Sequence, residues 1–350
     1  MDATTHLDEA LIPLATLGEW MDAKGLPAGE IEQVEPLGGG TQNVMIRFRR
    51  GGREYVLRRG PKHLRANSND AMRREARVLA ALADTDVATS RLIAACDDES
   101  VAAVFYLMEP VEGFNAASAL PQLHSGSAEI RYRMGLAAAA ALATLGAVDY
   151  RAVGLVDLGK PEGFLQRQVP RWLSELDSYR ANDGYPGHDL PHVDAIADWL
   201  ARNRPGSWTP GVMHGDYHLA NVMFAPDGPR VAAIVDWEMC TIGDPLLDLG
   251  WLLATWPEPG TVLAAASALG QAGGLASRAD LVVHYGRSSD RDLSAMTWYT
   301  VLASFKLAII LEGTYARACA GKAPRGTGEL LHAIAVDLFT RARVFADEGI

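Results

Sequence analysis

The chain has 350 residues, of which 49% are hydrophobic and 21% are charged, and these ordinary proportions exclude an extended disordered chain. Its net charge is −11 and it contains no run of lysine and arginine, so we expect no nucleic-acid partner. Three scattered cysteines provide neither a disulfide framework nor a Cys-x-x-Cys metal pair, which favours a cytoplasmic location.

The sequence also gives no reason to expect a membrane partner. The N-terminal residues lack the basic and apolar regions of a signal peptide. The most apolar long stretch, residues 296–311, contains Ser304 and Lys306 and is shorter than the roughly 20 residues that a membrane-spanning helix needs. We interpret this stretch as a buried helix.

Residues 1–110 predict a small antiparallel sheet that carries one helix. Strand-like runs bounded by turn residues are expected at 31–35, 42–50, 53–59, 91–95 and 104–108. The pair Gly51-Gly52 predicts a two-residue hairpin turn, and a helix is expected over 69–83. A packing helix is expected around 14–21, because apolar residues recur there at helical spacing after Pro13.

Residues 111–350 predict a larger, mainly helical part. Helices are expected at 130–148, 164–179, 193–201, 246–254, 293–318 and 329–346. Short strands and turns interrupt them between residues 211 and 244. We therefore expect an α+β fold with two domains, an N-terminal one at 1–110 and a C-terminal one at 111–350.

A polar loop between apolar runs carries the clearest chemical signal. The loop lies within residues 212–224, and a second apolar run, 232–235, ends abruptly at Asp236. A hairpin turn between them would bring Asn221, just before one strand, close to Asp236, just after the other. Amide and carboxylate oxygens are ligands suited to Mg²⁺. Asp216 would then face the same space as a general base or as a group that orients a hydroxyl.

Other interpretations of this region stay open. The side chains of His214, Asp216 and His218 would also suit a zinc ion, and single aspartates in loops are often only turn formers. Two further carboxylates stand at the start of the next helix, where a negative charge is favoured. We interpret the first, Asp244, as a helix cap and the second, Asp248, as a brace for the loop.

Glu75 is an unusual residue within the expected helix at 69–83. Met72, Leu79 and Leu82 form an apolar stripe on that helix, and Glu75 lies on the same stripe. A charge on an inward face needs a partner. The sequence therefore predicts a partner for Glu75 at this position.

The polar loop and its surroundings resemble the aminoglycoside phosphotransferase and choline kinase group. The resemblance rests on His-Gly-Asp-x-His-x-x-Asn at 214–221, Val-Asp-Trp-Glu at 235–238 and Gly-Asp-Pro-x-x-Asp-Leu at 243–249. Within the group, the chain is similar to phosphotransferase-like domains related to those fused to some acyl-CoA dehydrogenases. That similarity rests on residues 55–59, 74–75 and 305–313, and the whole resemblance covers about residues 30–345.

The resemblance implies a bilobal, protein-kinase-like fold and an enzyme that moves the γ-phosphate of ATP or GTP, with Mg²⁺, to a hydroxyl of a small molecule. The N-terminal lobe would bind the nucleotide. Asp216 would be the catalytic residue, and Asn221 and Asp236 the metal ligands. The residues implied to contact the nucleotide are Gly38, Gly39, Gly40, Thr41, Arg58, Glu75, Glu109 and Val111.

Arg58 departs from the pattern of the resembled enzymes. They place a lysine on the matching strand, where it pairs with the helix glutamate and holds the α- and β-phosphates. Arginine is planar and bidentate, so its phosphate geometry differs, although a pair with Glu75 is retained. Lys62 is a second candidate for this role, and a salt bridge at the surface is the other interpretation.

The acceptor is the least specified partner. We expect the helical domain to bind it through Asp290, Tyr299, Glu312, Tyr315 and Arg317. Aminoglycosides, choline, macrolides and sugars are candidate acceptors, and the similarity to the dehydrogenase-linked domains adds a hydroxyacyl-CoA. The alternative is a pseudokinase that binds nucleotide without catalysis. A monomer or a homodimer is expected.

Overall fold

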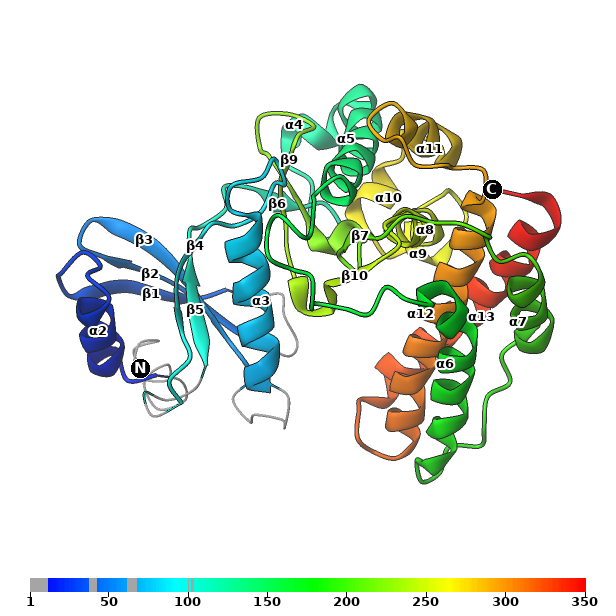
Figure 1. Ribbon diagram of the computed structural model, residues 1–350, viewed down its shortest axis with the longest axis horizontal. Coiled ribbons are helices and arrows are strands. Elements are labelled where there is room, and N and C mark those ends of the chain that lie inside the picture. Colours follow the sequence, from blue (N-terminus) through cyan, green and yellow to red (C-terminus); the bar gives the residue numbers. More distant parts are fainter. Residues whose placement is uncertain (1–11, 38–42, 62–67, 100, 102–103) are drawn as a thin grey trace. The chain divides into compact units, whose positions relative to one another are not determined.

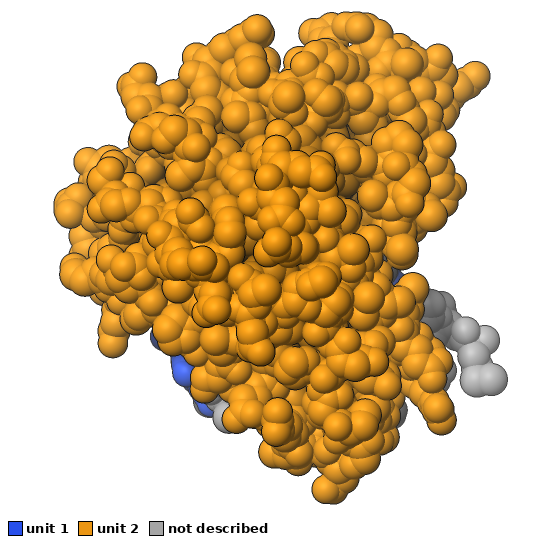
Figure 2. Space-filling view, turned by 90° about the vertical axis from the view of Figure 1, so that its right-hand side faces the viewer, with its two compact units in different colours: residues 1–112, 233–238 blue, residues 113–232, 239–350 orange. Residues whose placement is uncertain are grey.

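The computed structural model describes residues 12–37, 43–61, 68–99, 101 and 104–350. The chain divides into two compact units, which Figure 2 colours separately. Unit 1 comprises residues 1–112 and 233–238, and unit 2 comprises residues 113–232 and 239–350.

Unit 1 is built on a five-stranded antiparallel sheet with the strand order β1-β2-β3-β5-β4 (Figure 1). The strands are β1 (Ile31–Pro36), β2 (Val44–Arg50), β3 (Arg53–Arg59), β4 (Leu92–Cys96) and β5 (Phe105–Met108). Gly51 and Gly52 have φ values of 56° and 77°, and together they make the tight turn between β2 and β3. The predicted antiparallel sheet is confirmed.

Helices pack on both faces of this sheet, and its central strands are therefore buried on both sides. On one face, Tyr55 of β3 packs in the same core cluster as Leu17 of α2 (Leu14–Ala23). Side chains alternate along a strand, so Arg58, three residues after Tyr55, points to the opposite face. There α3 (Ser68–Leu82) packs against β3, β4 and β5.

The inward face of α3 is apolar except at one position. Its buried residues are Met72, Glu75, Ala76, Val78, Leu79 and Leu82. Glu75 is only 1% exposed, so the predicted inward glutamate is confirmed.

Residues 233–238 join unit 1 although they lie far along the chain. Ile234 forms a parallel bridge with Thr89, and its N–H donates to the carbonyl of Ala88 at 2.8 Å. Asp236 therefore belongs to the same unit as Arg58 and Glu75.

Unit 2 is mainly helical, and α12 (Met296–Cys319) packs along α13 (Arg325–Glu348) and α8 (Leu246–Ala254) (Figure 1). The other helices of at least nine residues are α5 (Ala128–Gly146), α6 (Phe164–Ser178), α7 (Val193–Arg202) and α11 (Arg278–Gly286). Shorter ones are α4 (Gln122–Ser125), α9 (Val262–Ala265), α10 (Ala268–Ala272) and the 3-10 helix η1 (Tyr179–Ala181). The mainly helical C-terminal part is thus confirmed.

Two small sheets frame the polar loop. The first pairs β7 (Gly211–Met213) with β10 (Thr241–Gly243), and the second has the order β6 (Phe114–Asn115), β8 (Val222–Phe224), β9 (Val231–Ile234). The loop leaves β7 and enters β8 through the 3-10 helix η2 (Leu219–Asn221), and β9 is followed by η3 (Trp237–Met239). The predicted hairpin is therefore present.

The helix expected to begin at Glu329 begins four residues earlier, at Arg325. Gly326 and Gly328 disfavour a helix when the sequence is considered alone. In the structure, Gly328 lies where α13 meets α12, and a Cβ at this position would overlap the Cβ of Ala318. Close packing of the two helices thus outweighs the low helix propensity of glycine.

No helix in the described part of the chain is both long enough and apolar enough to cross a membrane.

Candidate active site

The polar loop requires glycine at position 215. Gly215 has a φ of 88°, which L-residues rarely adopt. A Cβ there would overlap the carbonyl oxygen of Met239 and lie 3.0 Å from its carbonyl carbon. Backbone angle and space both exclude a side chain, so the loop packs directly on the backbone of Met239.

Asp248 holds this loop from the first turn of α8. Its buried carboxylate accepts the backbone N–H of His214 at 2.6 Å and that of Gly215 at 2.9 Å. Burial raises the pKa of Asp248 to about 7, although these two donors and the charge of Lys306 act in the opposite direction. The brace expected from the sequence therefore consists of two backbone hydrogen bonds.

Asp216 and Asn221 lie side by side, as their spacing predicts. The Nδ2 of Asn221 donates to the Oδ2 of Asp216 at 3.1 Å and to its carbonyl oxygen at 2.9 Å. Burial alone would raise the pKa of Asp216, but the hydrogen bond and charge of His218, with smaller effects of His214 and Lys306, lower it overall. Asp216 is therefore ionised at neutral pH and ready to accept a hydrogen bond.

The two loop histidines bind within the loop. The Nδ1 of His218 accepts the N–H of Ala220 at 3.2 Å, so the proton of a neutral ring lies on Nε2, 3.3 Å from Asp216. The Nδ1 of His214 accepts the N–H of Asp216 at 3.3 Å. Within the described ranges, these histidines do not belong to any three-residue group with metal-binding geometry. The alternative of a zinc site therefore has no support from this part of the chain.

In unit 1, Arg58 joins two carboxylates. Its Nη2 donates to the Oδ1 of Asp236 at 2.7 Å and to the Oε1 of Glu75 at 3.2 Å. Its Nε lies 2.9 Å from the Oε2 of Glu75, an ion-pair contact without hydrogen-bond geometry. Asp236 has a φ of 69°, rare for a residue other than glycine and often found at functional sites. The predicted partner of Glu75 is thus Arg58, which also binds Asp236.

The ion pair between Arg58 and Glu75 is buried, and Tyr106 binds the same carboxylate. Arg58 is 8% exposed, and the hydroxyl of Tyr106 donates to the Oε2 of Glu75 at 2.8 Å. Burial raises the pKa of Glu75 to about 7, while Arg58 and Tyr106 lower it. The interpretation as a surface salt bridge is therefore wrong, because the pair belongs to the interior of unit 1.

The carboxylates of unit 1 have the chemistry of a divalent-cation site. One oxygen from each of Glu75, Asp236 and Glu238 lies within 4.8 Å of the others. Glu238 was not singled out from the sequence, although it stands two residues after Asp236. In unit 2, Asn221 directs its amide nitrogen to Asp216, so its amide oxygen is the atom suited to a cation. Hard oxygen donors of this kind fit Mg²⁺.

The residues expected to contact the nucleotide are described only in part. Gly38, Gly39, Gly40, Thr41 and the alternative Lys62 lie outside the described residues. The side chain of Glu109 pairs with Arg53 at 2.7 Å, and its N–H donates to the carbonyl of Arg91 at 2.9 Å. The backbone carbonyl of Glu109 is thus the group suited to the predicted contact, and Val111 is half-buried.

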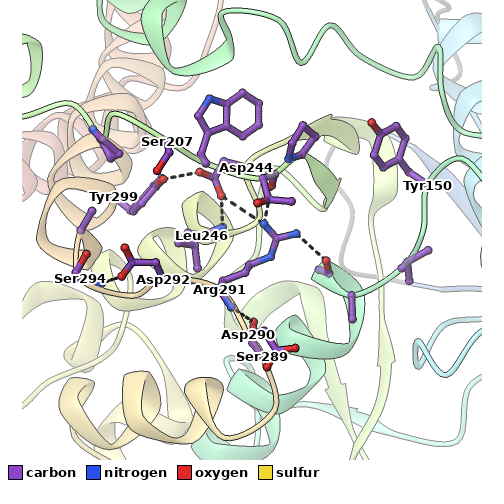
Figure 3. A pocket seen from close by; sticks show the side chains of 18 of the residues that line it. Tyr150, Ser207, Asp244, Leu246, Ser289, Asp290, Arg291, Asp292, Ser294 and Tyr299 are labelled. Atoms are coloured by element: carbon purple, nitrogen blue, oxygen red, sulfur yellow. Dashed lines mark hydrogen bonds and ion pairs between the residues drawn. The ribbon is translucent and has the colours of Figure 1, made fainter.

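Two of the five residues suggested for the acceptor line one cavity of unit 2. This cavity has a volume of about 880 Å³, and Asp290 and Tyr299 are among its lining residues (Figure 3). The hydroxyl of Tyr299 donates to the buried carboxylate of Asp244. Asp244 also accepts the N–H of Leu246, the first residue of α8, at 3.1 Å, although the N-cap residue of that helix is Pro245.

The other three do not line that cavity. Glu312 is fully buried and accepts the hydroxyl of Tyr185 at 2.6 Å, and its other oxygen lies 2.7 Å from the Nδ1 of His332. The ring of Tyr315 packs on His332 with centroids 4.5 Å apart, and Arg317 is exposed. An acceptor role of all five residues in one pocket therefore has no support from this arrangement.

Comparisons with known proteins identify a family and a set of longer relatives. The model of the phosphotransferase enzyme family matches residues 33–281. Acyl-CoA dehydrogenase family member 11 of Gallus gallus is 31% identical over 307 residues, which cover 85% of this chain and 38% of that protein. The chain thus spans about two fifths of the length of the curated relatives that it matches first.

Solved structures show the same similarity. A crystal structure from Ralstonia eutropha JMP134, named for the aminoglycoside phosphotransferases, has a TM-score of 0.77 at 30% identity and covers 95% of this chain and 99% of that one. A thermostable mutant of aminoglycoside phosphotransferase APH(4)-Ia, in a ternary complex with ADP and hygromycin B, has a TM-score of 0.56 at 14% identity and covers 91% and 98%. The second likeness shows the fold alone.

Proposed function

The chain belongs to the phosphotransferase enzyme family, and from this premise we propose that it is a Mg²⁺-dependent kinase that transfers the γ-phosphate of ATP or GTP to a hydroxyl of a small molecule. The observation that carries the proposal is the placement of the Asp216 carboxylate, 3.1 Å from the Nδ2 of Asn221 and 3.3 Å from the Nε2 of His218. Asn221 and His218 hold that carboxylate, and Gly215 and Asp248 shape the loop on which it stands.

Asp216 orients the acceptor hydroxyl and receives its proton. Its lowered pKa makes it a weak base, so its first task is to accept the hydrogen bond of the hydroxyl and turn the oxygen toward phosphorus. In a loose, metaphosphate-like transition state that oxygen has formed little bond to phosphorus, and a strong base is not required. The bond between the γ-phosphorus and the leaving ADP or GDP breaks as the new P–O bond forms, and the hydroxyl proton passes to the carboxylate.

Arg58, held by Glu75, contacts the nucleotide phosphates in this proposal. The Nη1 of Arg58 is 3.8 Å from the Sδ of Met45, a weak acceptor, so its N–H groups can serve a phosphate oxygen. Asp236 and Asn221 would hold Mg²⁺, which when bound neutralises charge on the phosphates. Residues 38–41 and the backbone at Glu109 would contact the rest of the nucleotide.

A hydroxyacyl-CoA is the second candidate acceptor, beside the aminoglycosides for which the neighbouring structures are named. It is favoured by the relatives, which are acyl-CoA dehydrogenases of which this chain spans only part. In those relatives a kinase domain and a dehydrogenase domain would be joined in one protein, and action on the same acyl chain would explain why they are joined. Cys96, Cys240 and Cys319 are not joined in disulfides, which supports our proposal of a reducing, cytoplasmic location.

The test combines nucleotide binding with turnover. Thermal shift with MgATP and MgGTP measures binding, and release of ADP or GDP is followed with aminoglycosides, choline and hydroxyacyl-CoA as acceptors. We expect Asp216→Ala to lower turnover by about 10²- to 10⁴-fold without unfolding the protein. The matched control is Asp227→Ala, at an exposed aspartate of the hairpin turn. Full turnover in folded Asp216→Ala would falsify the assignment, and binding without turnover with any acceptor would identify a pseudokinase.

A further inference from the structure

Lys306 is a buried charge that the proposed chemistry leaves without a role. It lies in the middle of α12 and is 6% exposed. Its neighbours on that helix, Phe305 and Ala308, are fully buried. A charged side chain in such surroundings costs folding free energy unless its charge is paired and its donors are used. The contacts of the ammonium group therefore indicate why a lysine stands here.

The ammonium group contacts the polar loop and two aromatic faces. Its Nζ donates to the carbonyl oxygen of Gly215 at 3.2 Å. The ring centroids of Trp251 and Trp172 lie 4.5 and 5.5 Å from Nζ, within the range of cation–π attraction. Two tryptophans on α8 and α6 thus surround a charge whose hydrogen bond goes to the residue just before Asp216.

The peptide bond between Gly215 and Asp216 is consequently held at both ends. Lys306 binds its carbonyl oxygen, and the Nδ1 of His214 accepts its N–H at 3.3 Å. The preceding N–H, that of Gly215, is bound by Asp248. Because a peptide unit is planar, contacts at both ends fix its rotation. The orientation of this plane sets the direction in which the side chain of Asp216 leaves the backbone.

We propose that Lys306 is a positioning residue for Asp216, whose ammonium group fixes the Gly215–Asp216 peptide so that the carboxylate is presented to the acceptor hydroxyl. The inference rests on the proposed function of Asp216. Filling the space between the tryptophans does not require a lysine, because methionine would fill it without burying a charge. Methionine, however, has no donor for the carbonyl oxygen of Gly215, so the hydrogen bond explains why a lysine stands here.

The electrostatics agree with this role. Burial lowers the pKa of Lys306 to about 8, while the carboxylates of Asp248 and Asp216 raise it and the guanidinium of Arg171 lowers it. These charged groups face Lys306 from α8, from the loop and from α6. The ammonium is thus present at neutral pH and is lost as the pH rises past about 8. Turnover is expected to fall over the same interval.

The experiment compares Lys306→Met with Lys322→Met, a control at an exposed lysine of unit 2. Both proteins are assayed for MgATP turnover with water as acceptor and with the best acceptor of the screen. We expect Lys306→Met to lower kcat by about 100-fold, the usual effect of a misplaced catalytic group, with the KM for MgATP changed by less than about 3-fold. It should also lack the fall in kcat above pH about 8 that the wild type shows.

Hydrogen exchange of the full chain provides a readout without turnover. Amides of residues 213–217 should exchange faster in Lys306→Met than in the control, while those of α13 stay protected. If the methionine variant does not fold, Lys306→Leu, which also lacks a hydrogen-bond donor, replaces it in both measurements.

The outcomes separate this inference from the proposed function. A folded Lys306 variant with wild-type kcat overturns the inference, and so does a rise in KM with unchanged kcat. If the wild type itself shows no turnover with any acceptor, the proposed function fails. Hydrogen exchange then still decides whether Lys306 holds the loop, and unchanged protection of residues 213–217 overturns that claim.

Discussion

Replacing Gly215 by alanine tests how strongly the structure constrains the catalytic loop. Alanine at a left-handed backbone costs about 1–2 kcal/mol. Its Cβ would also overlap the carbonyl oxygen of Met239 and lie 3.0 Å from the carbonyl carbon, and forcing an extra carbon into a packed site costs about 1–3 kcal/mol. We therefore expect Gly215→Ala to lower the free energy of unfolding by about 2–5 kcal/mol, at the upper end for a single substitution.

The assay is urea unfolding followed by tryptophan fluorescence, together with nucleotide turnover. The matched control is Gly228→Ala in the hairpin turn of the same unit, where no atom lies within 4 Å of an added Cβ and φ is not positive. Because the substitution displaces the residue before Asp216, turnover should fall even in the folded fraction. An unfolding midpoint of Gly215→Ala equal to that of the control would refute the reasoning.

Two further predictions concern stability. The pKa of Asp248 is raised in the folded protein from 3.8 to about 7, so folding favours the protonated carboxyl. The free energy of unfolding of the wild type, relative to that of Asp248→Asn, should therefore fall as the pH rises from 3.8 to about 7 and change little at higher pH. A difference between the two proteins in urea unfolding that does not vary with pH would contradict this. On α13, Gly328→Ala should destabilise by about 1–3 kcal/mol through overlap with α12. Gly326→Ala, with open space around it, should stabilise by up to about 1 kcal/mol. Thermal unfolding shifts of the same sign in the two variants would argue against the packing explanation.

Local spacing in the sequence was sufficient for the chemical core of the loop. Asp216 and Asn221 are five residues apart, and the 3-10 helix η2 ends at Asn221, whose amide lies 3.1 Å from the carboxylate. The inward position of Glu75 was equally predictable, because helical periodicity is a property of neighbouring residues. In both cases few residues intervene, so the backbone geometry leaves little freedom.

Tertiary structure alone decided which distant side chains meet around the loop. Asp248 and Lys306 bind Gly215 from 33 and 91 residues away. Tyr299 and Glu312, suggested for one acceptor site, each bind a buried partner instead. The periodicity of a helix predicts which of its faces is buried but carries no information on what packs there. The polar loop was therefore determined by the sequence, whereas the set of residues that holds it depends on how α8 and α12 pack in unit 2.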